Sequence, residues 1–411
     1  MRLLCGVFIV AALSFFFLRP IETEDIWWHL STGRWIVEHG VVPNSDIFAF
    51  DQAHPAPGIC FQWLGSVMYY GVYALGGFAG LKIFRVLIFQ AAHLLFFWYS
   101  SRKNPPLVSF VLTVLLAFAC HGRVLLRPFV FNMIFAQILL IACLGCGVFE
   151  KKYARLALFA LGAVWFNVHL GAFIDGGLIL GAFGLEYVLK GCQKDHTKLW
   201  MTCRNVLLTA GAYMAGFICN PYGVKGLFYP FFVFLNPNYE RFQFYRFSQF
   251  IYELQPPRFI FNWHGWWFHL LFAFGLFALI FNKQRRLSLT VLFAAATALF
   301  LMYQRASLFF ALTAVYTISE NFNAMFAGKP QLFFKKAWVQ WVSIAVIGAC
   351  FLVYSALRSQ QRFVIDGDIV IRRDLVLDTD NPRDAVEFLK QHGLSGRIFN
   401  SDVYGGYLIW E

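Results

Sequence analysis

Residues 22–50 read ETEDIWWHLSTGRWIVEHGVVPNSDIFAF and form the first polar stretch of a chain that is otherwise mostly apolar. The apolar run 3–19 precedes this stretch, and a long series of further apolar runs follows it. Apolar segments of spanning length on both sides of a polar stretch are typical of a loop at the surface of a membrane. This pattern therefore predicts a protein that crosses the membrane many times. We interpret residues 22–50 as its active-site loop.

The composition favours the same class. The 411 residues are 59% hydrophobic and 14% charged, whereas a soluble domain carries charge on about a quarter of its residues. The formal net charge of +12 comes mostly from Lys and Arg in short loops between apolar runs, which is typical of topology signals. We therefore expect contact with the lipid bilayer and no nucleic-acid partner. Most of the nine cysteines lie within or beside apolar runs, which indicates packing and gives no zinc or redox motif.

Windows of about 17–25 apolar residues have the length of a membrane-spanning helix. The stretch 62–80 is apolar but rich in Gly and Tyr, and we assign it to a helix at the membrane interface, because counting it as a span would invert every later turn. The expected fold is an all-α polytopic bundle of about eleven transmembrane helices. These spans are predicted at 3–19, 83–100, 106–121, 128–149, 155–169, 171–190, 205–220, 264–281, 287–303, 306–324 and 338–356.

The distribution of lysine and arginine predicts the orientation. With a cytoplasmic N-terminus on a retained signal anchor, every cytoplasmic turn is basic, while the first outer loop is acidic. The predicted membrane domain covers 1–357, with external loops at 20–82 and 221–263. The basic turns are those at 102–103, 151–155, 190–204, 283–286 and 329–336.

The tail 358–411 is more charged, and we interpret it as the start of a small external α/β domain. A strand is predicted at Asp368–Arg372 and a helix at Pro382–His392, which ends before Gly393. A second strand is predicted at Arg397–Asn400, and a turn at Tyr404–Tyr407. Because the tail ends before such a domain can close, we expect the chain to be a fragment or a shortened gene product.

Asp25 lies just after the first span, at the predicted outer mouth of the bundle. Sugar transfer from a lipid phosphate needs a base for the acceptor proton and cations for the departing phosphate. Asp25 is the candidate base. A purely structural role of Asp25 and Arg34 at a helix end is an equally good interpretation of the composition alone. The candidate cations are Arg34, Arg123, Arg127 and Arg305.

Further polar residues converge on the same predicted face of the membrane, where they would shape an acceptor or sugar pocket. His29 shares a helical face with Asp25 if this stretch is helical. A histidine such as His169 is more often a hydrogen-bonded structural residue, and Asn220 precedes a proline in a turn signal. The complete set of candidate pocket residues is His29, Asp46, Asn167, His169, Asn220 and Glu253.

The run Asp25–Gly40, DIWWHLSTGRWIVEHG, resembles a large group of bacterial multi-span proteins assigned to the GT-C superfamily of lipid-phosphosugar-dependent glycosyltransferases. The chain departs from the pattern at Thr23, where relatives often have an acid, and at Phe61-Gln62, where a His-Glu pair is common. The resemblance covers nearly the whole chain. Other matching pieces are Arg127–Phe129, Asn167–Gly171, Asn220–Gly223, Glu253–Pro257, Arg305 with Phe309, and Phe399–Trp410.

The resemblance implies an inverting hexosyl or pentosyl transferase of the bacterial inner membrane, which acts in the cell envelope with Asp25 as the base. It implies a polyprenyl-phosphate sugar donor and a glycan, lipid or protein acceptor on the outer face. Some GT-C enzymes use a divalent metal such as Mg²⁺ or Mn²⁺ near that acid, whereas the residues themselves establish no cofactor.

Three alternatives remain beside this hypothesis. A surface-glycan polymerase or ligase shares the architecture and releases a lipid pyrophosphate. A transporter or flippase belongs to a different class, but its polar groups would be expected near the midplane on broken helices. A degenerate, inactive member of the superfamily would keep the fold and lose the chemistry.

Overall fold

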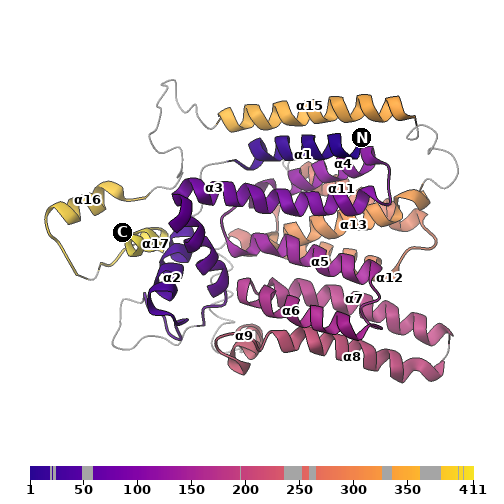
Figure 1. The fold of residues 1–411 in the computed structure, drawn as a ribbon, viewed down its shortest axis with the longest axis horizontal. Coiled ribbons are helices and arrows are strands. Elements are labelled where there is room, and N and C mark those ends of the chain that lie inside the picture. Colours follow the sequence, from indigo (N-terminus) through magenta and orange to yellow (C-terminus); the bar gives the residue numbers. More distant parts are fainter. Residues whose placement is uncertain are drawn as a thin grey trace.

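The computed structural model describes residues 1–18, 21, 25–48, 59–194, 196–235, 252–258, 265–325, 336–361, 381–396, 398–400 and 402–411. Within these ranges the regular secondary structure is helical. Most of the helices lie nearly parallel in one bundle, and a smaller group that includes α2 (Asp25–His39) and α17 (Asp402–Trp410) sits at one end of it (Figure 1).

A helix coincides with each of the predicted spans. Five helical segments are long and apolar enough to cross a membrane, and three shorter helices are also apolar, within the part of the chain that the structure describes. The helical membrane fold is confirmed, and the number of crossings stays a prediction. The bundle helices are α1 (Arg2–Phe17), α3 (Trp63–Ser101), α4 (Pro106–Cys120), α5 (Asn132–Gly145), α6 (Lys152–Val168), α7 (Gly171–Lys194), α8 (Leu199–Gly216), α11 (Trp266–Phe281), α12 (Leu287–Met302), α13 (Ser307–Met325) and α15 (Ala337–Gln361).

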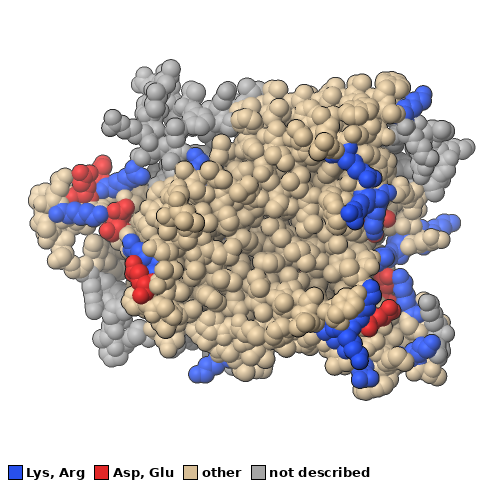
Figure 2. Space-filling view, viewed as in Figure 1, with Lys and Arg blue, Asp and Glu red and all other residues tan. Residues whose placement is uncertain are grey.

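Four of the five turns that the sequence assigns to the cytoplasm lie together at one end of the bundle, which we call the basic end. The fifth, at 329–336, lies outside the described residues except for Lys336. The basic end holds the α3–α4, α5–α6, α7–α8 and α11–α12 turns, where Lys and Arg gather (Figure 2). The opposite end, called the site end, is formed by α2, α9 (Val224–Leu235) and a set of short 3-10 helices. These are η1 (His121–Arg123), η2 (Pro128–Phe131), η4 (Tyr252–Leu254) and η7 (Gln304–Ala306), whereas η3 (His196–Lys198) belongs to the basic end.

Helix α2 packs against the first part of α3, and a glycine makes this contact possible. A Cβ atom at Gly33 would lie 2.3 Å from the backbone oxygen of Ser66, so a larger residue would force the two helices apart. Helix α3 is broken at Gly77, whose φ of 58° is in the left-handed region. The predicted separate helix at 62–80 therefore corresponds to the segment before this break, and its place at the membrane interface stays a prediction.

The tail differs from its predicted pattern in two elements. Helix α16 (Arg383–Gln391) confirms the predicted helix and its stop near Gly393, which has a φ of 61°. The turn predicted at Tyr404–Tyr407 is wrong, because α17 covers these residues. Its two glycines allow close packing on Trp28, so tertiary contact outweighs their poor helix propensity. Residues 398–400 have no regular structure instead of the predicted strand, and Asp368–Arg372 lies outside the described residues.

Candidate functional site

Asp25 begins helix α2 at the site end and is the outermost member of an ion-paired group. Its Oδ2 atom lies 2.7 Å from Nε of Arg127, and Arg127 Nη1 lies 3.1 Å from Oε1 of Glu253. The same Glu253 oxygen pairs with Nη1 of Arg123 at 2.5 Å. We call these four residues the carboxylate–arginine cluster. Asp25 keeps 44% of its side chain exposed, so the carboxylate is both held by Arg127 and accessible from outside.

The cluster brings together residues from three distant parts of the chain. Burial alone would raise the pKa of Glu253, but the charges of Arg123 and Arg127 hold it below its usual value. Arg123 is 6% exposed and its guanidinium also lies 4.4 Å from the ring centroid of Phe129. The negative charge of Glu253 therefore compensates for the cost of burying the Arg123 guanidinium.

The arrangement does not fit the divalent metal that the resemblance allows. The guanidinium of Arg127 stands between the carboxylates of Asp25 and Glu253 and bonds to both. Across the described ranges, no group of three or more His, Cys, Asp or Glu side chains is placed to hold a metal ion. Glu22 and Glu24, which flank Thr23 in the predicted loop, lie outside those ranges.

His29 follows Asp25 by one turn of α2, as the predicted shared face requires. Its Nδ1 atom lies 3.0 Å from the hydroxyl oxygen of Ser66. Burial, with a further contribution from the charge of Arg127, lowers the pKa of His29 to about 3. The imidazole is therefore neutral near pH 7, and it can donate one hydrogen bond and accept another without adding a charge to the site.

A pocket of about 370 Å³ adjoins the cluster and shares Arg123 with it. Its walls come from η1, η2, α5, α7, η4, α12, η7 and α13, and most of its lining side chains are apolar. This size and mixture are typical of a site for a small organic group. The polar lining residues are Gln62, Arg123, Asn132, His169, Asp175, Tyr303 and Arg305.

A chain of hydrogen bonds fixes the orientation of His169 in the pocket wall. Trp165 Nε1 donates to Oδ1 of Asn132 at 2.8 Å, which turns the amide nitrogen of Asn132 toward His169 Nδ1 at 3.0 Å. The backbone N–H of Gly171 also donates to Nδ1, at 2.9 Å. Because Nδ1 accepts from an N–H, the proton of the neutral ring lies on Nε2.

Two predicted residues serve the local backbone instead of the pocket. Asn167 accepts from Nε1 of Trp63 at 2.6 Å and donates to the Cys219 carbonyl at 2.8 Å. Asn220 bonds within its own turn, where its amide donates to the carbonyls of Phe217 and Gly223. Both residues therefore shape the site end from outside the cavity.

Two other predicted residues lie in helix α2 and in the loop that follows it. Asp46 accepts the backbone N–H of Phe48 at 3.0 Å, so its carboxylate stabilises a loop turn. Arg34 donates to the carbonyl of Trp410 at 3.1 Å, and its guanidinium lies 4.4 Å from the Trp410 ring centroid. These contacts join α2 to the C-terminal helix α17.

Asp175 is the charged pocket residue that the sequence reasoning missed, and the polar residues Asn132 and Tyr303 were missed as well. Asp175 belongs to α7, inside the apolar window 171–190 that the sequence assigns to a span. An acid within a spanning segment is rare and is by default a functional signal, so this rule was the one that could have identified it. Gln62 also lines the pocket, at a position noted above only for its departure from the His-Glu pair.

Comparisons with known proteins give a fold and no close relative. No family model matches the chain, and no curated protein matches it in sequence. The apo crystal structure of the Archaeoglobus fulgidus oligosaccharyltransferase is similar, with a TM-score of 0.57 and 14% identity over 100% of this chain and 63% of that chain. A structure of oligosaccharyltransferase AglB from this organism, with an inhibitory peptide and a dolichol-phosphate, gives a TM-score of 0.55 and 13% identity over 94% of this chain and 57% of that one.

These likenesses show the fold of the chain. The chain is a helical membrane protein with the GT-C type of fold found in oligosaccharyltransferases, which confirms the expected fold class. It spans less than two thirds of the length of these structures. At this level of identity the similarity shows the fold, and the chemistry has to be argued from the site.

Proposed function

We propose that the protein is a membrane glycosyltransferase that moves a sugar from a polyprenyl-phosphate-linked donor to an acceptor on the outer face of the bacterial inner membrane. The observation that carries the proposal is the position of Asp25. Its carboxylate is half-exposed at the site end, held by Arg127 and linked through Glu253 to the Arg123 wall of the pocket. The clustering of basic turns at the other end supports an external site.

In the proposed reaction, an acceptor hydroxyl oxygen attacks the anomeric carbon of the donor sugar. The new carbon–oxygen bond forms as the bond from that carbon to the phosphate oxygen breaks, so the configuration inverts and the polyprenyl phosphate leaves with the bonding electron pair. The carboxylate of Asp25 takes the proton of the acceptor hydroxyl. Arg305 at the pocket rim, together with the arginines of the cluster, stabilises the charge that develops on the phosphate.

A second candidate from the same class is a ligase that transfers a whole glycan from a lipid pyrophosphate. The observation that favours it is the similarity to an oligosaccharyltransferase, of which one structure is reported with dolichol-phosphate. The mass of the transferred product separates the two candidates, since the first adds one sugar and the second adds an assembled glycan. In either reaction Asp25 has the same role.

The test compares two carboxylates on α2 in proteoliposomes supplied with radiolabelled undecaprenyl-phosphate sugars and an envelope extract as acceptor source. We expect Asp25→Asn to lower the transfer rate by about 100-fold or more, because a general base contributes about 10²–10⁴. The matched control is Glu38→Gln, since Glu38 is exposed on the same helix. Wild-type transfer that survives Asp25→Asn would refute the assignment of the base.

A further inference from the structure

Three polar groups line the pocket, and each has an atom without a hydrogen-bond or ion-pair partner among the described residues. Among the described residues, no hydrogen bond or ion pair engages the carboxylate of Asp175 or the guanidinium of Arg305. His169 uses Nδ1 for its two protein contacts, which leaves the Nε2–H group free at the pocket wall. Arg305 is exposed at the rim, whereas His169 is buried and Asp175 is partly buried. An unsatisfied polar group that is shielded from water is costly unless a ligand or a water molecule completes its hydrogen bonds.

The charges of these groups restrict what the ligand can be. A phosphate at Asp175 would place an anion beside a carboxylate, and an ammonium group would meet Arg305, which lies close enough to Asp175 and His169 to act on both electrostatically. A neutral group that both donates and accepts hydrogen bonds suits an acceptor at Asp175 and a donor at His169. A hydroxyl group does both.

The walls of the pocket point to the same ligand chemistry. The cavity of about 370 Å³ has room for one small ring, and Phe129, Phe173 and Phe309 provide apolar surface around it. A sugar ring combines apolar C–H faces with hydroxyl groups at its edge. The pocket offers apolar surface together with a carboxylate, an N–H and a guanidinium.

We propose that Asp175 is a specificity-determining residue of the protein, which accepts a hydrogen bond from a hydroxyl of the donor sugar while His169 Nε2–H donates to a hydroxyl of the same ring. This assignment rests on the proposed function and names where the sugar binds. Asp25 then acts on the acceptor outside the pocket, and Asp175 selects the donor within it. The two carboxylates have separate tasks.

The test measures equilibrium binding of defined lipids to the full chain in nanodiscs. The probes are undecaprenyl phosphate alone and the same lipid carrying glucose, galactose, mannose or N-acetylglucosamine. In the wild type, we expect at least one sugar-bearing lipid to bind more tightly than the bare lipid phosphate. We expect Asp175→Asn to reduce that gain by about tenfold, because the hydrogen bond to a charged acceptor is weakened, and to leave the binding of the bare lipid phosphate unchanged.

Two controls keep the outcomes distinct. Asp175→Glu should recover part of the gain in affinity, and Asp384→Asn, on the exposed helix α16, should not change it. The inference would be overturned if the sugar-bearing lipids bound the wild type no more tightly than the bare lipid phosphate, or if Asp175→Asn left their gain in affinity unchanged. In both cases, binding of the bare lipid phosphate would still support a lipid-phosphate donor. Failure of the wild type to bind any of the lipids would overturn both the inference and the proposed function.

Discussion

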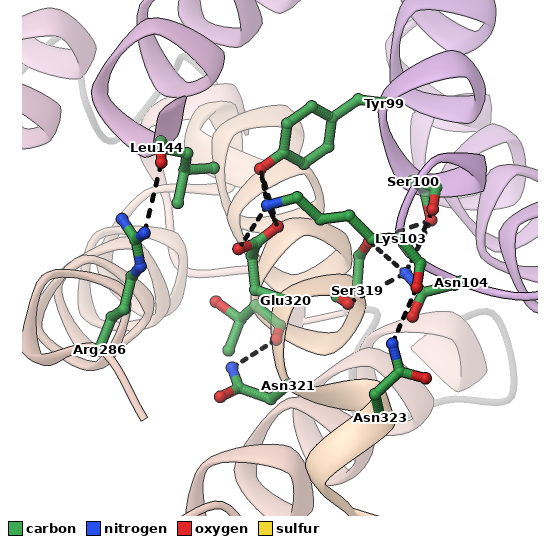
Figure 3. Close-up of polar contacts among 11 residues, drawn as sticks. Tyr99, Ser100, Lys103, Asn104, Leu144, Arg286, Ser319, Glu320, Asn321 and Asn323 are labelled. Atoms are coloured by element: carbon green, nitrogen blue, oxygen red, sulfur yellow. Dashed lines mark hydrogen bonds and ion pairs between the residues drawn. The ribbon is translucent and has the colours of Figure 1, made fainter. Parts of the chain in front are cut away.

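The two ends of the helix bundle use polar side chains in opposite ways. At the basic end, Nζ of Lys103 bonds to both carboxylate oxygens of Glu320 at 2.7 and 2.9 Å, and the Tyr99 hydroxyl lies within hydrogen-bond distance of both residues (Figure 3). The amide of Asn104 donates to the Ser319 hydroxyl at 2.9 Å. These contacts tie the ends of α3 and α13 together (Figure 3).

At the site end, by contrast, only some of the polar side chains bond to other groups of the protein. The carboxylate–arginine cluster pairs its charges, but Arg305 and Asp175 have no ion pair within the described part of the chain. A paired network fixes helices, whereas polar groups that face a cavity are available to a ligand. The difference indicates which end of the bundle is built for binding.

The largest effect on stability is expected at the cluster. Glu253→Gln would remove the counter-charge of the buried Arg123, so we expect the free energy of unfolding to fall by about 3 kcal/mol. Chemical unfolding of the purified protein, followed by tryptophan fluorescence, measures this change. Glu38→Gln, at an exposed carboxylate, should change stability by less than about 0.5 kcal/mol. Equal effects would show that Glu253 balances no buried charge.

A smaller effect is expected where α2 meets α3. Gly33→Ala would bring a methyl group against the backbone of Ser66, and overpacking of this kind costs about 1–3 kcal/mol. Because α2 carries Asp25, we also expect a lower transfer rate. Gly6→Ala is the control, since a Cβ atom there has no neighbour within 4 Å. A neutral Gly33→Ala would contradict the close packing of these helices.

At the basic end, Lys103→Ala should cost stability without reducing the intrinsic transfer rate. The side chain of Lys103 is 40% exposed, so we expect a loss of only about 1 kcal/mol in the free energy of unfolding. Lys283→Ala, at an exposed lysine in another basic turn, serves as the comparison. A transfer rate that falls with Lys103→Ala in fully folded protein would remove the distinction between the two ends.

The smallest effect near neutral pH is expected from the ionisation of His29. The folded state holds the pKa of His29 at about 3, below its ordinary value of 6.5, so between these values the unfolded chain binds more protons. Stability should therefore fall as the pH is lowered from about 6.5 towards 3. We expect His29→Gln to make Tm depend less steeply on pH in this window. An identical pH dependence in both proteins would contradict the burial of a neutral His29.

Much of the fold could be predicted from the sequence because the membrane imposes one pattern. Apolar windows of spanning length predicted helices where the structure has them, and basic residues predicted which turns share an end. The helix over Tyr404–Tyr407 was missed, and a turn was predicted there, because the two glycines suggest a break locally. Their contact with Trp28, which lies far away in sequence, is what makes a helix there.

The candidate site was predicted less completely. Asp25, Arg127 and Glu253 were recognised as separate candidates, but no sequence spacing reveals that Arg127 pairs with both carboxylates. Asn167 and Asn220 converge on the predicted face but satisfy backbone groups there. Asp175 was hidden in a window that hydropathy treats only as a span.

The most direct test of the central claim compares one carboxylate from each end of the bundle in the same proteoliposomes. We predict that Asp25→Asn lowers sugar transfer from undecaprenyl-phosphate donors by about 100-fold or more, with the protein inserted and folded. Glu320→Gln should retain the wild-type rate per folded molecule, although it unfolds more easily. Similar rates for the two variants would contradict the assignment of catalysis to the site end.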